Sequence, residues 1–219
     1  EKGAAAPDKA RNLLFVRHGA ASRAAALVSG VLAVLLSAAL GWKVFLAAAF
    51  FWAAGMMYPY KLPPGGKLSS FPASKDLVTA LGWAFMCAYA PGLWHAGALS
   101  SSTQLAVLFA FLLVFARSVM FGMVNAHSDM IVGKENFYKA AGPRLTYFTL
   151  SAIFAVLIAV LLALRGMGWQ PGLAEALLTG LLYDLGLMLF FFNRLPERIT
   201  AETLIDSQFM LFALLAWAV

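Results

Sequence analysis

The sequence has little charge and almost no cysteine. Charged residues make up 12% of the 219 residues and hydrophobic residues 62%, with a mean hydropathy of +0.81. Soluble domains carry about 25% charged residues, so this composition excludes a soluble globular domain and indicates an integral membrane protein. The single cysteine, Cys87, lies in an apolar run, which excludes an internal disulfide and a cysteine-based metal cluster.

Histidine is also scarce. His18, His95 and His127 are far apart, so the sequence does not predict a histidine metal site. His127 lies beside a polar stretch, but its residue type and place favour a solvated loop. The net charge of +6 does not indicate nucleic-acid binding, because the basic residues lie in the gaps between apolar runs and form no compact cluster.

Long apolar runs dominate the rest of the chain. They have the length of membrane-spanning helices and lack the alternation of a membrane barrel. We therefore predict an all-α, multi-pass transmembrane bundle of about seven spans, forming one transmembrane domain over residues 1–219. The second and last runs are the weakest span candidates. The runs are Ala24–Leu40, Val44–Tyr58, Leu77–Leu93, Leu105–Met123, Leu145–Leu164, Leu173–Phe192 and Leu204–Val219.

The basic residues are distributed unevenly between the two sets of loops. Thirteen of the sixteen Lys and Arg residues lie in 1–23, 59–76, 125–144 and 193–203, whereas the alternating loops hold only Lys43 and Arg165. By the positive-inside rule the first set is cytoplasmic. We expect a multi-pass protein of a bacterial inner (plasma) membrane, with the amino end cytoplasmic and the carboxyl end outside.

Polar residues gather in FGMVNAHSDMIVGKE, residues 121–135, directly after an apolar run. Ser118, Gly122, Asn125 and Asp129 follow a 4-3-4 spacing, which aligns them on one face if the helix continues. Asp and Asn oxygens suit Mg²⁺, which is often held together with substrate phosphates. The stretch therefore predicts a hard-metal or phosphate site at the membrane surface, or else an ordinary polar helix end.

Two loops on the expected cytoplasmic side supply basic residues for such a site. Lys75 comes directly before a span, and Lys134 follows the polar stretch. Both are candidates for holding phosphate charge, with topology signalling as the alternative. For Lys139 and Arg144 the topology interpretation is preferred.

Three ionisable residues fall inside apolar segments: Arg117, Asp184 and Asp206. A charge near the bilayer centre costs about 2.5–3.5 kcal/mol on insertion scales, so each needs a polar environment. Arg117 is expected either to bind an anionic substrate or to form a structural ion pair with Asp184 or Asp206. Structural hydrogen bonding is favoured for Asp184, and exposure at the interface is open for Asp206.

These motifs resemble the UbiA-type intramembrane prenyltransferases. That family has nine membrane helices and two Asp-rich motifs, the second reading like D-x-x-x-D followed by V-G-K/R. Here NAHSDMIVGKENF, the preceding FARSVMFG and the earlier YPYKL and FPASKDLVTALGWA are similar. The resemblance covers nearly the whole chain and implies that the seven spans correspond to the third through ninth helices of the family.

The resemblance implies transfer of a polyprenyl group from its diphosphate to an aromatic or other lipophilic acceptor, with Mg²⁺ as cofactor. It implies that Asp129 and Asn125 are the catalytic and metal-binding residues. Lys75, Lys134 and Arg117 fall at positions suited to the diphosphate. The partners would be polyprenyl diphosphate, the acceptor and the lipid bilayer, with no nucleic acid.

The chain departs from the family pattern at three points. Asn125 replaces the first Asp of the second motif, N-F-Y at 136–138 replaces T-L-P, and no N-D-x-x-D-x-x-x-D motif is present. We therefore expect either an amino-terminally truncated UbiA-like domain or a degenerate relative. The alternative is a non-catalytic membrane protein, a transporter or assembly factor, in which Arg117, Asp184 and Asp206 line a path through the bilayer.

Overall fold

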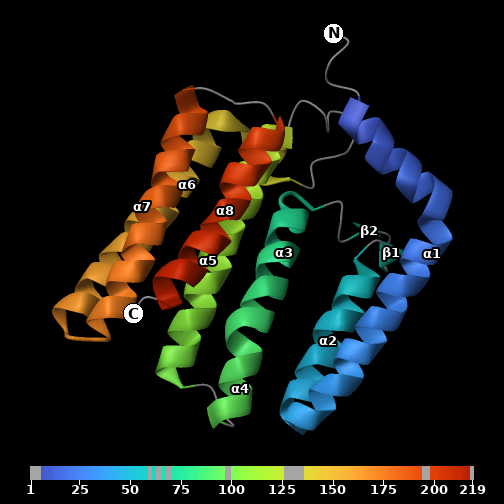
Figure 1. Cartoon of the computed structure of the whole chain (residues 1–219), viewed down its shortest axis with the longest axis horizontal. Coiled ribbons are helices and arrows are strands. Elements are labelled where there is room, and N and C mark those ends of the chain that lie inside the picture. Colours follow the sequence, from blue (N-terminus) through green and yellow to red (C-terminus); the bar gives the residue numbers. More distant parts are fainter. Residues whose placement is uncertain are drawn as a thin grey trace.

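The structure, a computed structural model, describes residues 6–58, 61–62, 66–67, 71–96, 100–125, 136–193 and 198–217. It is a helical bundle (Figure 1), which confirms the predicted all-α class. A helix covers each of the seven predicted apolar runs. Continuous helices are expected here because the bilayer leaves the backbone no other partner for its N–H and C=O groups.

The helices follow one another along the chain with one small hairpin among the described residues. Between α2 and α3, the two-residue strands β1 and β2 pair antiparallel, with Lys61 opposite Lys67; the sequence did not predict this hairpin. The elements are α1 (Ala6–Ser37), the 3₁₀ turn η1 (Ala38–Leu40), α2 (Trp42–Met57), β1 (Lys61–Leu62), β2 (Gly66–Lys67), α3 (Ser74–Ala84), the π-helical turn η3 (Phe85–Tyr89), α4 (Ala90–Ala96), α5 (Ser101–Asn125), α6 (Phe137–Gly166), α7 (Pro171–Asn193) and α8 (Arg198–Trp217).

Five helical segments of the described chain are long and apolar enough to cross a membrane. They support a multi-pass integral membrane protein. Of the seven predicted spans, α2 is apolar but shorter, and α8 is not among the five. These are the second and last runs, the two weakest span candidates in the sequence. The five are His18–Leu40, Ser74–His95, Ser101–Val124, Phe137–Gly166 and Pro171–Phe192.

The third predicted span contains a π-helical turn. Pro91 has no N–H, and in a regular α-helix its ring would clash with the carbonyl of residue 87. The chain widens into the π turn Phe85–Tyr89 directly before this proline. A single π turn inside an α-helix is a common response to such a disruption, so α3, η3 and α4 form one continuous helix with a local distortion.

The buried core lies among α5, α6, α7 and α8, with α3 packed on α5. Val119 and Met120 of α5 and Leu150 of α6 are fully buried there, together with Leu181 of α7 and Ile205 of α8. The α1–α2 hairpin packs on the other side of the bundle, where α2 contacts α4 (Figure 1). The core therefore holds together α5, which leads into the polar stretch, and the three helices that follow it.

The helices alternate in direction, so their ends form two groups. The amino ends of α3, α6 and α8 lie at the same end of the bundle as the carboxyl ends of α5 and α7, at the top of Figure 1. The basic segments of the sequence adjoin this end. Its assignment to the cytoplasm remains a prediction from the loop charges.

Gly180 of α7 lies where Phe212 of α8 packs closely. A Cβ atom at Gly180 would stand 2.2 Å from Cε1 of Phe212, whereas a Cβ atom at Gly186, further along α7, would meet nothing within 4 Å. The two glycines lie in the same helix, but only Gly180 is closely packed against a side chain of another helix.

We expect Gly180→Ala to destabilise the bundle by about 1–3 kcal/mol, because Phe212 must shift to admit the methyl group. Gly186→Ala, the matched control, should be neutral or stabilising by about 0.5–1 kcal/mol, since alanine favours the helix. Denaturation in SDS followed by far-UV circular dichroism measures both. Equal midpoints for the two variants would contradict the close packing at Gly180.

Candidate functional site

A buried carboxyl group joins three helices at the top of the bundle. Asp76, in the first turn of α3, is 1% exposed. Its Oδ1 accepts a hydrogen bond of 2.6 Å from the Ser118 hydroxyl of α5, and its Oδ2 accepts one of 2.6 Å from the backbone N–H of Phe137, the first residue of α6. Both oxygens of the buried carboxyl group are therefore satisfied by groups from two other helices.

The start of α6 is built to meet this carboxyl group. Asn136 is its N-cap, with extended backbone, and its Oδ1 accepts from the N–H of Tyr138 at 2.9 Å. The first N–H groups of a helix lack partners within the helix and carry partial positive charge. Asn136 satisfies one of these groups and Asp76 another, so the helix end is capped from both sides.

A glycine on α5 makes room for the cap. A Cβ atom at Gly122 would stand 2.1 Å from Nδ2 of Asn136, so any larger residue would push the cap away from α5. Ser118 and Gly122 therefore share one helix face, as their spacing predicted, and both adjoin the start of α6. Asn125 is the last residue of α5, and its side chain is not described. Asp129 and Lys134 lie outside the described residues, as does His127.

The approach to α3 is held in an unusual conformation. Ala73 has a φ of +61°, in the left-handed region that non-glycine residues seldom adopt. The hydroxyl of the next residue, Ser74, lies 3.1 Å from the hydroxyl of Tyr58 at the end of α2. Lys75 is exposed while its neighbour Asp76 is buried, so the turn presents the lysine outward and fixes the aspartate inward.

Asp76 directly follows Lys75 in the sequence FPASKDLVTALGWA, but only the lysine is a predicted site residue, because phosphate recognition needs positive charge. A signal was present: an acidic residue opens an otherwise apolar span, and burying it requires donors from elsewhere. The polar face of α5 could have supplied the first of these, Ser118. The second is a backbone group, which a sequence pattern does not reveal.

Arg117 forms the structural ion pair that was one of its two expected roles. Its guanidinium contacts the carboxylate of Asp206 on α8. The guanidinium carbon also lies 4.6 Å from the ring centre of Phe121 and 4.9 Å from that of Phe209. Such cation–π contacts favour a guanidinium in an apolar setting. The ion pair links α5 to α8. On α5, Arg117 lies about 100° around the helix from Ser118, the partner of Asp76.

Asp184 has the structural hydrogen bonding that the sequence favoured. It is fully buried in α7. With the amide of Gln208 oriented so that its nitrogen faces the carboxyl group, that nitrogen donates to Oδ1 at 2.8 Å and to Oδ2 at 2.9 Å. Asp184 therefore joins α7 to α8.

The described residues contain no group of three or more His, Cys, Asp or Glu side chains that could hold a metal ion. The predicted Mg²⁺ ligands, Asn125 and Asp129, fall where side chains are not described. The nearby described carboxyl group is Asp76, and both of its oxygens already accept hydrogen bonds. In the fold, Asp76 joins α5, the helix before the predicted ligand Asp129, to the start of α6, the helix after it.

The fold and this cluster define a multi-pass, all-α membrane protein with a polar cluster at one end of the bundle. Comparison with known proteins adds nothing to this class: no protein-family model, no curated protein and no solved structure matches the chain.

Replacing Asp76 by alanine should destabilise the protein by about 1–3 kcal/mol for each buried donor left unpaired, here the Ser118 hydroxyl and the Phe137 N–H. Lys75→Ala, next to it but exposed, should change stability by less than about 0.5 kcal/mol. Hydrogen exchange at the start of α6 reports the local effect. Unchanged protection in Asp76→Ala would show that the carboxyl group does not hold this helix end.

A double-mutant cycle tests the pairing of Arg117 with Asp206. Arg117→Met and Asp206→Asn should each destabilise the bundle, with a coupling energy of about 0.5–3 kcal/mol between them, as is usual for residues in direct contact. SDS denaturation of the four proteins measures it. Additive effects of the two substitutions would contradict a structural pair and return Arg117 to the anion-binding interpretation.

Proposed function

We propose that the chain is a UbiA-type membrane prenyltransferase, which transfers a polyprenyl group from its diphosphate to an aromatic or other lipophilic acceptor. The observation that supports this best is the Asp76 network. It joins the Lys75 turn to the start of α6 and to Ser118 of α5, the helix that ends at Asn125. These two helix ends flank residues 126–135, which carry Asp129 and Lys134.

This arrangement suits a diphosphate because two basic residues and two oxygen ligands belong to neighbouring segments. Asn125 and Asp129 are the residues that would hold Mg²⁺, which when bound neutralises diphosphate charge. Lys75 and Lys134 would hold the remaining phosphate oxygens. Arg117 contributes less in this proposal, since its guanidinium already faces Asp206.

The reaction breaks the bond between the first prenyl carbon and the diphosphate oxygen, and the diphosphate leaves with the electron pair. A new bond then forms from that carbon to the acceptor, which loses a proton. Cationic side chains stabilise the charge that develops on the leaving group. An apolar environment protects the allylic cation from water, and the helical bundle supplies one.

The transporter or assembly-factor alternative receives no support from the three intramembrane ionisable residues. Asp206 and Gln208 are two residues apart on α8, about 200° around a helix of 3.6 residues per turn. Arg117 pairs on the Asp206 side, and Asp184 bonds to Gln208 on the other. In the described chain these residues therefore join helices on two different faces of α8 rather than lining one path.

We expect Asp129→Ala to lower Mg²⁺-dependent release of diphosphate from labelled farnesyl or geranylgeranyl diphosphate by about 10²-fold or more, since it removes the proposed carboxylate ligand. Membranes containing the protein provide the assay.

Glu175→Gln is the matched control. Glu175 is a half-exposed carboxylate at the opposite end of the bundle, 2.7 Å from Arg165, and its loss should leave turnover unchanged. Absence of any metal-dependent turnover in the parent protein would overturn the transferase proposal. Equal turnover in Asp129→Ala and the parent protein would overturn the assignment of Asp129.

A further inference from the structure

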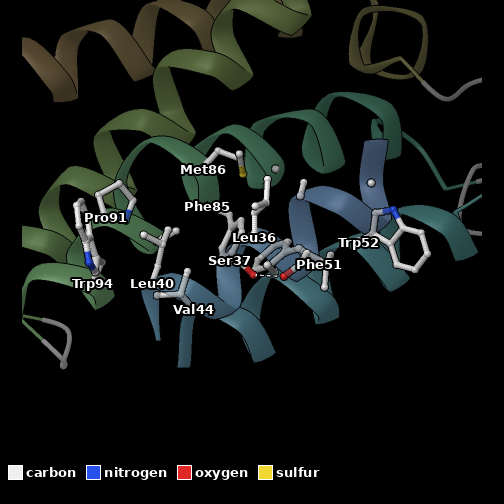
Figure 2. Close-up of a pocket in the computed structure, with 16 residues that line it drawn as sticks. Leu36, Ser37, Leu40, Val44, Phe51, Trp52, Phe85, Met86, Pro91 and Trp94 are labelled. Atoms are coloured by element: carbon white, nitrogen blue, oxygen red, sulfur yellow. Dashed lines mark hydrogen bonds between the residues drawn. The ribbon is translucent and has the colours of Figure 1, made fainter. Parts of the chain in front are cut away.

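A cavity of about 740 Å³ lies between the α1–α2 hairpin and the bent helix α3–η3–α4 (Figure 2). Binding cavities for small molecules fall within about 300–1,000 Å³, so this one is large enough for a ligand. Residues from all three helices form its walls, among them Val34, Leu40, Val44, Phe51, Met86 and Trp94.

The walls offer little to recognise a polar group. Among the described residues that line the cavity, none is Lys, Arg, Asp or Glu. The hydroxyl of Ser37 already donates to the carbonyl oxygen of Val34 at 2.6 Å. On one side, the rings of Phe51 and Phe85 stack with centres 4.3 Å apart and interplanar angle 24°. The ligand that fits such walls is a hydrocarbon.

The depth of the cavity matches one leaflet of a membrane. Its lining runs along α1 and η1 from Gly30 to Leu40, which at 1.5 Å per residue is about 15 Å. Half of a hydrocarbon core of about 30 Å is also about 15 Å. At the outer end stands Trp94, and tryptophans of membrane proteins collect at the membrane–water interfaces. The inner end reaches Trp52 of α2 and Gly82 of α3.

We propose that this cavity binds one acyl chain of a bilayer lipid, from the leaflet on the side of the α1–α2 turn. The chain lies along α1 with its methyl end toward Gly82, and the headgroup stays outside at the level of Trp94. The bilayer supplies acyl chains throughout this depth. A polyprenyl diphosphate would instead need cationic partners, which the lining residues do not provide. The site is independent of the proposed transferase chemistry.

Gly82 offers a way to fill the cavity without disturbing the helix. It lines the cavity, and a Cβ atom there would meet nothing within 4 Å. Gly186 of α7 has equally open space and lies outside the cavity. Gly82→Phe and Gly186→Phe therefore add the same ring at two open helical positions, of which only the first blocks an acyl chain.

The test uses the protein in dioleoylphosphatidylcholine vesicles containing a phosphatidylcholine with a photoreactive diazirine in its acyl chain. Trp52 lines the inner end of the cavity, as Gly82 does, and Leu162 of α6 is 52% exposed to the surroundings of the bundle. After irradiation, mass spectrometry of peptides gives the labelling of Trp52 relative to Leu162. We expect clear labelling of Trp52, reduced about fivefold or more by Gly82→Phe because the added ring takes the space that the end of the acyl chain would fill. Gly186→Phe should leave the ratio unchanged.

Three results would overturn the proposal: no labelling of Trp52 in the parent protein, an equal Trp52 ratio in the two phenylalanine variants, or stronger labelling of Trp52 by a diazirine-bearing farnesyl diphosphate than by the phospholipid. If Gly82→Phe does not fold, Gly82→Leu replaces it and should reduce the ratio in the same direction. The labelling of Trp52 in the parent protein is decisive without either variant.

Discussion

The hydrogen bonds of Asp76 connect the parts of this protein on which its proposed chemistry depends. A carboxyl group buried among apolar helices costs several kcal/mol unless donors reach it. Here the donors are the hydroxyl of Ser118 and the first N–H of α6. Because one carboxyl group accepts both hydrogen bonds, the starts of α3 and α6 are tied to each other and to α5 at Ser118.

The bundle has two regions with different packing. Four helices, α5 to α8, share a buried core and are joined by polar pairs such as Arg117 with Asp206 and Asp184 with Gln208. The α1–α2 hairpin packs instead over the bent helix, leaving the apolar cavity between them. The bend follows from Pro91, which disrupts the regular hydrogen bonding of its helix. Local covalent geometry thus contributes to the shape of the cavity.

The two proposed sites lie at different depths and use different physics. The polar cluster at the top of the bundle combines backbone donors, a buried carboxyl group and an exposed lysine, which suits charged groups. The described residues that line the cavity are mostly apolar and carry no charge, which suits hydrocarbon. A membrane protein that handles a prenyl group needs polar recognition near the surface and apolar surroundings deeper down, and the transferase proposal assigns the first to residues around Asn125 and Asp129.

Composition and periodicity alone determined the all-α membrane class, the places of the helices and the shared face of Ser118 and Gly122, because these depend on the local pattern of apolar residues. The sequence left open which partner Arg117 would take, and it passed over Asp76 in favour of Lys75. Only the tertiary structure decided these points. An ion pair across 89 residues and a carboxyl group capping the backbone of another helix depend on how the helices pack, and the order of residues along one helix carries no record of that packing.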